Sequence, residues 1–169
     1  MFKKSILLLF VFGITQLVMA QEMNNEKLEV VLETVADSVN GYPGYWEVNY
    51  KERQLLCLTD ESHNRMRIIS PIIEVDKLDE NLLLDVLTAN FHAALDVKYA
   101  ISKGVLWSVF IHPLKELEES EVTSAVNQVV NAVNNFGTTF SSTEMIFGGG
   151  KPEGSSQVEP DESPVLNKL

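Results

Sequence analysis

The stretch that decides the fold is LTANFHAALDVKYAISKGVLWSVFIHPL, Leu87 to Leu114. Its first third repeats apolar residues at helical spacing, and the rest alternates like a strand, turns at Lys103-Gly104 and alternates again. Glycine supplies the positive φ that a tight hairpin turn commonly needs. The stretch therefore predicts a helix that leads directly into an apolar β-hairpin.

The second arm of this hairpin is apolar on both of its faces. One face is expected to carry Val105, Trp107, Val109 and Ile111, and the other Leu106, Ser108, Phe110 and His112. We expect a helix layer over one face and a second layer or another chain over the other. Trp107 and Phe110 point to opposite faces, so whichever lies outside the core is a candidate anchor for a dimer or ligand surface. Burial of both by helices and loops is the alternative.

Upstream of this stretch, the sequence predicts one helix and three strands. The helix is indicated by helical spacing of Leu28, Val31, Leu32, Val35 and Val39, with Asn24 or Asn25 as its cap and Asn40-Gly41 as its stop. The strand-like runs are YWEVNYKE, RQLLCLTD and NRMRIISPIIEV. In the first run Trp46, Val48 and Tyr50 face one way. Pro71 in the third run indicates a sheet edge, a bulge or the end of the strand.

Two further helices complete the domain. The first, capped by Asp79, has a predicted core-facing stripe of Leu83, Leu84, Leu87, Phe91, Ala94 and Leu95. The last is valine-rich, with Val122, Val126, Val129, Val133, Phe136 and Phe140 at helical intervals. Gly137 either ends this helix or lies within it. The predicted order is α-β-β-β-α-β-β-α, which indicates an α+β fold with helices packed on an antiparallel sheet.

The two ends of the chain have a different composition from the middle. Residues 1–20 read as a signal peptide, with a basic start, an apolar run and a small-residue site after Ala20. Residues 21–147 are then a single α+β domain. Residues 148–169 are rich in Gly, Ser, Pro and acid and predict a disordered tail. The expected location is periplasmic or secreted, without stable membrane insertion after cleavage of the signal.

The net charge limits the classes of partner that the chain can bind, and the number of cysteines limits its disulfides. The formal net charge is −11, and loss of residues 1–20 removes two lysines and no acid, which makes it −13. Such a charge disfavours nucleic acid, whose binding requires Lys and Arg to neutralise phosphates. Cys57 is the single cysteine, so no internal disulfide can form. Its apolar neighbours predict a buried, inert thiol.

No pattern in the sequence predicts catalysis, a cofactor or a metal. The histidines His63, His92 and His112 fit no zinc-binding spacing, and no serine lies in a G-x-S-x-G elbow. The acids Glu116, Glu118, Glu119 and Glu121 precede the last helix, where carboxylates complement the helix dipole. The segment GGGKPEG lacks the spacing of a phosphate-binding loop. The protein is therefore predicted not to be an enzyme.

The order of elements and the central stretch together resemble the type III secretion chaperone-like fold, and within it the YbjN-like bacterial family. The resemblance lies in LLDVLTANF followed by DVKYAISKGVLWSVFIHPL and then EVTSAVNQVVNAVN, and it covers roughly residues 26–140. It implies a compact α+β domain without catalytic residues that commonly dimerises and binds segments of other proteins.

Two functions follow as hypotheses. The first is an exported, chaperone-like binding module that acts as a homodimer and holds a protein segment. The alternative is a carrier of a small apolar ligand, enclosed in a pocket between helices and sheet.

Overall fold

The computed structural model describes residues 22–143. The predicted signal peptide (1–20) and the predicted tail (148–169) lie outside the described residues. In chain order the elements are α1 (Asn25–Val35), β1 (Ser38–Tyr42), β2 (Tyr45–Tyr50), β3 (Arg53–Asp60), β4 (Arg65–Glu74), the short 3-10 helix η1 (Val75–Lys77), α2 (Glu80–His92), β5 (Lys98–Ser102), β6 (Val105–His112) and α3 (Glu119–Asn134).

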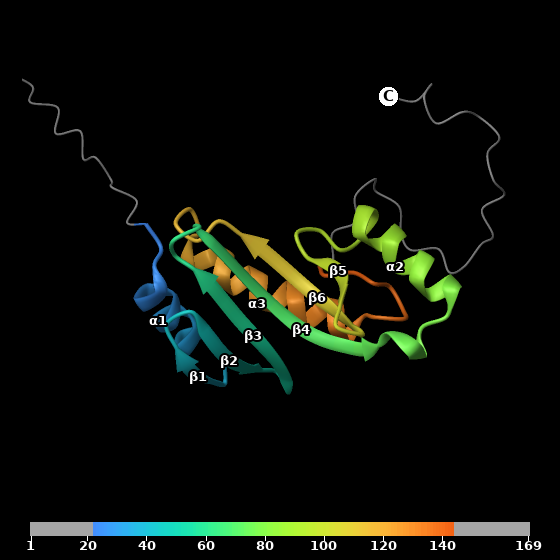
Figure 1. Ribbon diagram of the computed structural model, residues 1–169, viewed down its shortest axis with the longest axis horizontal. Coiled ribbons are helices and arrows are strands. Elements are labelled where there is room, and N and C mark those ends of the chain that lie inside the picture. The colour runs from blue at the N-terminus through green and yellow to red at the C-terminus, as the bar shows by residue number, and fades with distance from the viewer. Residues whose placement is uncertain (1–21, 144–169) are drawn as a thin grey trace, which may run out of the picture.

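The strands form one antiparallel sheet in the order β1-β2-β3-β4-β6-β5, so β1 and β5 are its edges. α1 and α3 pack against each other, and α3 lies against β4 and β6 on one face of the sheet (Figure 1). α2 contacts the edge strand β5. The predicted α+β class, an antiparallel sheet with helices packed on it, is confirmed. Within residues 22–143, no helix has the length and apolarity needed to cross a bilayer.

The region after α1 differs from the prediction. Asn24 caps the helix as expected, its side chain accepting from the Lys27 N–H, but α1 ends at Val35. Val39 and Gly41 belong to β1, an additional strand that pairs with β2 through a tight turn at Pro43-Gly44. Gly41 has φ of 152° there, and a Cβ on it would lie 2.1 Å from the Tyr45 carbonyl oxygen. The predicted helix stop is therefore a glycine required by close strand pairing.

The middle strands follow their predicted alternation. Trp46 and Val48 of β2 are buried on the face that the helices cover, and Tyr50 is half-buried beside them. β4 continues through Pro71 to Glu74, and its register with β6 shifts between Pro71 and Ile73. Of the three readings of Pro71, two are observed: the register with β6 shifts at this position, and β3 pairs with β4 only as far as Ile69, so Pro71 has a strand neighbour on one side only.

The core lies between the sheet and α3. The buried face of α3 is made largely of valines, among them Val122, Val126, Val129 and Val133. Valine has low intrinsic helix propensity, so this helix depends on its packing. The buried Ser108 hydroxyl of β6 donates to the Val129 carbonyl of α3 (3.0 Å), so its donor is not left without a partner. α3 ends at Asn134, and Gly137 lies beyond it with φ of 75°.

The central hairpin forms as predicted, with Lys103 and Gly104 both at positive φ in the turn. Leu106, Ser108 and Phe110 of β6 are buried on the helix side. The opposite face was expected to be covered as well, but no described helix lies over it (Figure 1). The expectation that another chain covers this face stays a prediction.

Candidate binding surface

The two aromatic candidates on β6 point to opposite faces, as their alternation requires. Phe110 is buried on the helix side. Trp107 is half-buried on the outer face of the sheet, and its indole N–H donates to the Ser102 carbonyl (3.1 Å). Trp107 is therefore the aromatic that lies outside the core. Its role as an anchor for a partner stays a prediction.

Trp107 belongs to an apolar area on the outer face of the sheet. Leu56, Ile69 and Val109 lie side by side across β3, β4 and β6, as the strand registers show. Ile111 is 57% exposed on the same face. We call this area the outer sheet patch; its members are Leu56, Leu58, Ile69, Trp107, Val109 and Ile111. The exposed Arg67 lies between Leu58 and Ile111 on this face. Apolar groups that meet across adjacent strands without a covering layer form a surface suited to contact with another molecule.

A second apolar surface lies on α2, and it corrects the predicted stripe. Leu84 is 61% exposed, Leu87 58% and Phe91 80%, and we call these three side chains the α2 stripe. The side chains that α2 buries are Val86 and Ala89. The helical period was right, and of the predicted stripe Ala94 is buried and Leu83 is half-buried, but the helix turns Leu84, Leu87 and Phe91 to solvent. Three large apolar side chains at i, i+3 and i+7 form one continuous strip.

Asn90 holds α2 in this orientation. Its amide group donates to the backbone carbonyl of Tyr99 (3.1 Å) and accepts from the backbone N–H of the same residue (2.7 Å). The amide thus pairs with the outer edge of β5 as a neighbouring strand would. The Lys98 ammonium donates to the Asn90 carbonyl (3.0 Å), which adds a contact between β5 and the end of α2. The large apolar side chains of α2 therefore stay on the side away from β5.

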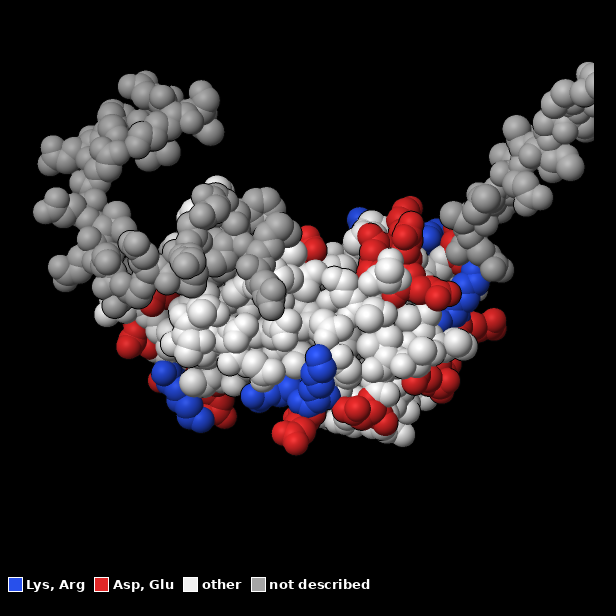
Figure 2. Space-filling model, turned by 180° about the vertical axis from the view of Figure 1, so that it is seen from behind, with Lys and Arg blue, Asp and Glu red and all other residues white. Residues whose placement is uncertain are grey.

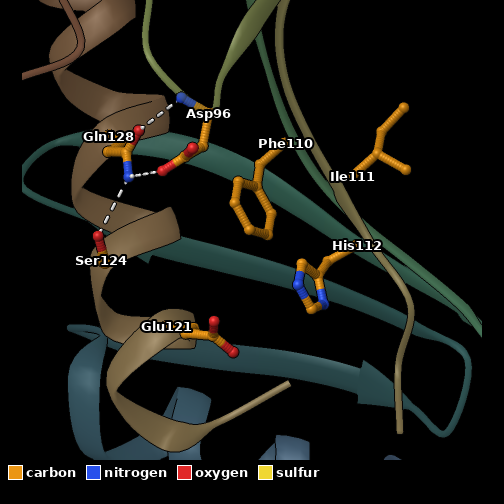
Figure 3. Close-up of a pocket in the computed structure, with 7 residues that line it drawn as sticks. All are labelled: Asp96, Phe110, Ile111, His112, Glu121, Ser124 and Gln128. Carbon is orange, nitrogen blue, oxygen red and sulfur yellow. Dashed lines mark hydrogen bonds between the residues drawn. The ribbon is translucent and has the colours of Figure 1, made fainter. Parts of the chain in front are cut away.

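A cleft of about 300 Å³ lies between β6 and α3, and we call it the β6 cleft (Figure 3). It is lined by Asp96, Phe110, Ile111, His112, Glu121, Ser124 and Gln128. The rings of Phe110 and His112 are parallel, with 6.0 Å between their centroids. Asp96 lies on one side of the Phe110 ring and Glu121 on the other (Figure 3). The cleft thus combines an aromatic wall with two carboxylates.

Hydrogen bonds hold both carboxylates in place. Gln128 donates to Asp96 Oδ2 (3.1 Å), and the Asp96 N–H donates to Gln128 Oε1 (3.3 Å). Glu121 Oε2 accepts from the Glu118 N–H (2.7 Å) as part of a capping box at the start of α3. Glu121, which was predicted to complement the helix dipole, therefore also forms part of the wall of the cleft. Groups held by such contacts lose little freedom when a ligand binds.

The surroundings of the other titratable groups indicate structural roles. Burial raises the pKa of the Cys57 thiol to about 12, which makes it unreactive. Hydrogen bonds from Ser62 and His63 lower the pKa of Asp60 to about 2. His92 is exposed and lies against the Phe91 ring. Across residues 22–143, no three His, Cys, Asp or Glu side chains lie close enough together to hold a metal ion.

The helix side of the molecule has few charges at its centre. Figure 2 shows Lys, Arg, Asp and Glu side chains around the margin of a broad uncharged area. Beyond Glu119 at the start of α3, the exposed residues along this helix fit this picture, since Ser120, Thr123, Ser124 and Asn134 are polar and uncharged. After its first residue, α3 therefore presents hydrogen-bonding groups rather than charges to solvent.

Comparison with known proteins identifies the fold. No protein-family model matches the chain, and no curated protein matches it. The predicted likeness to the YbjN-like family is thus not confirmed. Among solved structures, the chain is similar to a chain of the HopA1–SchA chaperone–effector complex, with a TM-score of 0.50 and 12% sequence identity over 66% of this chain and 94% of that one. At this identity the likeness concerns the fold alone. The chain has a type III secretion chaperone-like α+β fold.

Proposed function

We propose that the protein is a non-enzymatic, chaperone-like module that works as a homodimer and binds a segment of another polypeptide. The observation that carries the proposal is the α2 stripe, whose three large side chains are more than half exposed on one helix face. Contiguous apolar surface of this kind on a folded domain marks an interaction site. The similar chain in a chaperone–effector complex supports a protein as the class of partner.

The α2 stripe suits contact between two copies of the chain. A twofold axis brings the same patch of both subunits together, and a straight apolar strip on one helix is complementary to itself. Two such helices can pack side by side and bury Leu84, Leu87 and Phe91 against their copies. The outer sheet patch then stays available for the partner segment, with Trp107 as its aromatic anchor.

Export is the second part of the proposal. We expect the mature chain to begin at Gln21 and to work in the periplasm or outside the cell. The intact mass of protein recovered from an envelope or secreted fraction tests this directly. A mass that includes residues 1–20 would contradict it.

The alternative, a carrier of a small apolar ligand, requires an apolar enclosure. The β6 cleft does not favour it, because its wall carries Asp96, Glu121 and the buried polar Gln128. The carrier hypothesis predicts an apolar molecule in the denatured, extracted protein, and mass spectrometry of that extract would detect it.

The solution mass of the mature chain (residues 21–169) tests the homodimer. Light scattering after size-exclusion chromatography is expected to give twice the mass of one chain. The double variant Leu87→Ser/Phe91→Ser is expected to give the mass of one chain, because it removes most of the α2 stripe. Asp85→Ser is the matched control, an exposed residue of the same helix outside the stripe, and it should remain dimeric. A monomeric wild type at high concentration would refute the dimer, and a dimeric double variant would refute the assigned surface.

A further inference from the structure

The β6 cleft exists because β5 ends before β6 does. β6 pairs with β4 as far as His112, which lies opposite Met66. On its other side, β6 pairs with β5 only as far as Val109, which lies opposite Lys98. The last three residues of β6 (110–112) therefore have a strand neighbour on one side only.

The chain departs from the sheet before Lys98 for an identifiable reason. Leu95 has φ of 46°, which turns the backbone, and the Asp96 N–H is bound by Gln128 of α3 rather than by β6. Asp96 is the residue that would lie opposite Ile111 if β5 continued. The position beside Ile111 is thus left open, and the β6 cleft occupies it (Figure 3).

The alternation of antiparallel pairing shows which backbone groups face this opening. Both backbone groups of Tyr99 point away from β6, because they bond the Asn90 amide. Hydrogen-bonded pairs alternate along an antiparallel ladder, so Lys98 and Ala100 are the residues of β5 that bond β6. Their partners are Val109 and Trp107, and the next residue of β6 in this series is Ile111. The N–H and C=O of Ile111 therefore point into the β6 cleft, where no described strand pairs with them.

The side chains around this opening have the chemistry to bind a cationic side chain. An extended segment paired with Ile111 would direct the side chains next to the pairing residue to the helix side, where Phe110 and His112 lie. There the Phe110 and His112 rings form the β6 side of the cleft, with Asp96 beside Phe110 and Glu121 toward His112 (Figure 3). A basic side chain can stack its stem or its guanidinium on such a wall and place its charge between the carboxylates.

We propose that the β6 cleft binds an extended segment of a partner polypeptide, which pairs with the backbone of Ile111 and places a lysine or arginine side chain between Asp96 and Glu121. This inference rests on the proposed protein-binding function. It adds the β6 cleft to the outer sheet patch as a contact for the partner segment, since Ile111 belongs to both, and it names the chemistry of the segment. The net charge of the chain, −11, favours the approach of a basic segment.

A peptide titration followed by NMR tests the proposal on the mature chain. The probe is an acetylated and amidated pentapeptide, Thr-Val-Arg-Val-Thr, and the matched probe has glutamine in place of arginine. The arginine peptide is expected to shift the amide resonance of Ile111 and to bind at least about threefold more tightly than the glutamine peptide. Equal binding of both peptides, or shifts confined to the α2 stripe or to the members of the outer sheet patch other than Ile111, would overturn the proposal.

Charge-neutralising variants make the test specific to the cleft. Asp96→Asn and Glu121→Gln keep side chains that can accept the hydrogen bonds from Gln128 and from the Glu118 N–H, so the fold is expected to survive. Together they should weaken the arginine peptide by at least about threefold and leave the glutamine peptide unchanged. Glu119→Gln removes a neighbouring exposed acid that does not line the cleft, and it should change neither.

Two further outcomes separate the possible failures. Arginine amide that binds as tightly as the arginine peptide would show a site for small cations and overturn the pairing with Ile111. A chain that dimerises through the α2 stripe but binds no peptide at the β6 cleft would refute this inference and leave the homodimer standing. A monomeric chain that binds the arginine peptide at Ile111 would do the reverse.

Discussion

Replacing Asn90 with alanine tests how α2 is held at the edge of the sheet. The substitution removes the two hydrogen bonds between the Asn90 amide and the backbone of Tyr99. Each contributes about 1 kcal/mol net, so their loss costs about 2 kcal/mol. Alanine has the higher helix propensity, by up to about 0.7 kcal/mol, and that gain offsets part of the loss. We expect the free energy of unfolding to fall by roughly 1 to 2 kcal/mol.

Urea unfolding followed by tryptophan fluorescence measures this change, because Trp46 is fully buried. Asn81→Ala is the matched control. Asn81 is an exposed asparagine in the first turn of the same helix, and its amide has no hydrogen-bond partner among the described residues, so its variant makes the same change of side chain without the loss of those two hydrogen bonds. Hydrogen exchange at the Tyr99 amide gives a local reading. We expect exchange about tenfold faster in Asn90→Ala, and a smaller change in Asn90→Asp, which keeps the acceptor.

The reasoning would be refuted by an Asn90→Ala variant that is as stable as Asn81→Ala and exchanges the Tyr99 amide at the wild-type rate. That result would mean that the burial of Val86 and Ala89, with the Lys98 contact to the residue 90 carbonyl that the variant keeps, is enough to position α2. The orientation of the α2 stripe would then not depend on the Asn90 amide.

Three further predictions concern single residues. Cys57 is expected to resist a thiol reagent at pH 8 in the folded chain and to react fully in urea, because burial raises its pKa to about 12; rapid labelling of folded protein would contradict this. The pKa of Asp60 is about 2 in the folded chain and about 3.9 in an unfolded one, so its contribution to stability is present above about pH 4 and is lost as the pH falls toward 2. Urea midpoints of Asp60→Asn should therefore fall less steeply than those of the wild type between pH 4 and pH 2, and parallel curves would count against the cause. Gly41→Ala should destabilise by more than about 1 kcal/mol, through positive φ and a clash with the Tyr45 carbonyl, whereas Gly104→Ala adds a Cβ into open space and should cost less; equal losses in thermal unfolding would refute the clash.

Local rules explain the parts of the fold that the sequence predicted. Asp79 accepts from the Leu82 N–H as an N-cap, and Lys103-Gly104 forms the hairpin turn, because each depends on neighbours in the chain. The alternation of Trp46 and Val48 predicted their common face for the same reason. β1 was missed because Val39 continues the helical spacing of α1, and only pairing with β2 shows that it belongs to a strand.

The binding surfaces depend on contacts that no local pattern specifies. Leu84, Leu87 and Phe91 have the period of a core-facing stripe, and a period does not state whether the cover comes from the same chain or from another. The β6 cleft joins Asp96, before β5, to Glu121, at the start of α3, through Gln128 and the end of β6. Glu121 could be singled out from the sequence as part of an acidic run, but Asp96, on the other side of the cleft, could not.

The valine-rich composition of α3 has a consequence for the order of folding. A helix of β-branched residues gains little from forming alone, so it is stable only once β4 and β6 offer their buried face. The sheet in turn lacks its main cover until α3 has been synthesised, since α3 follows every strand that the structure describes. We therefore expect a polypeptide built in this way to lack stable tertiary packing for most of its synthesis. We propose that this chain is exported. Late folding would keep it unfolded, as translocation across a membrane requires, and would delay hydrophobic collapse until translocation is complete.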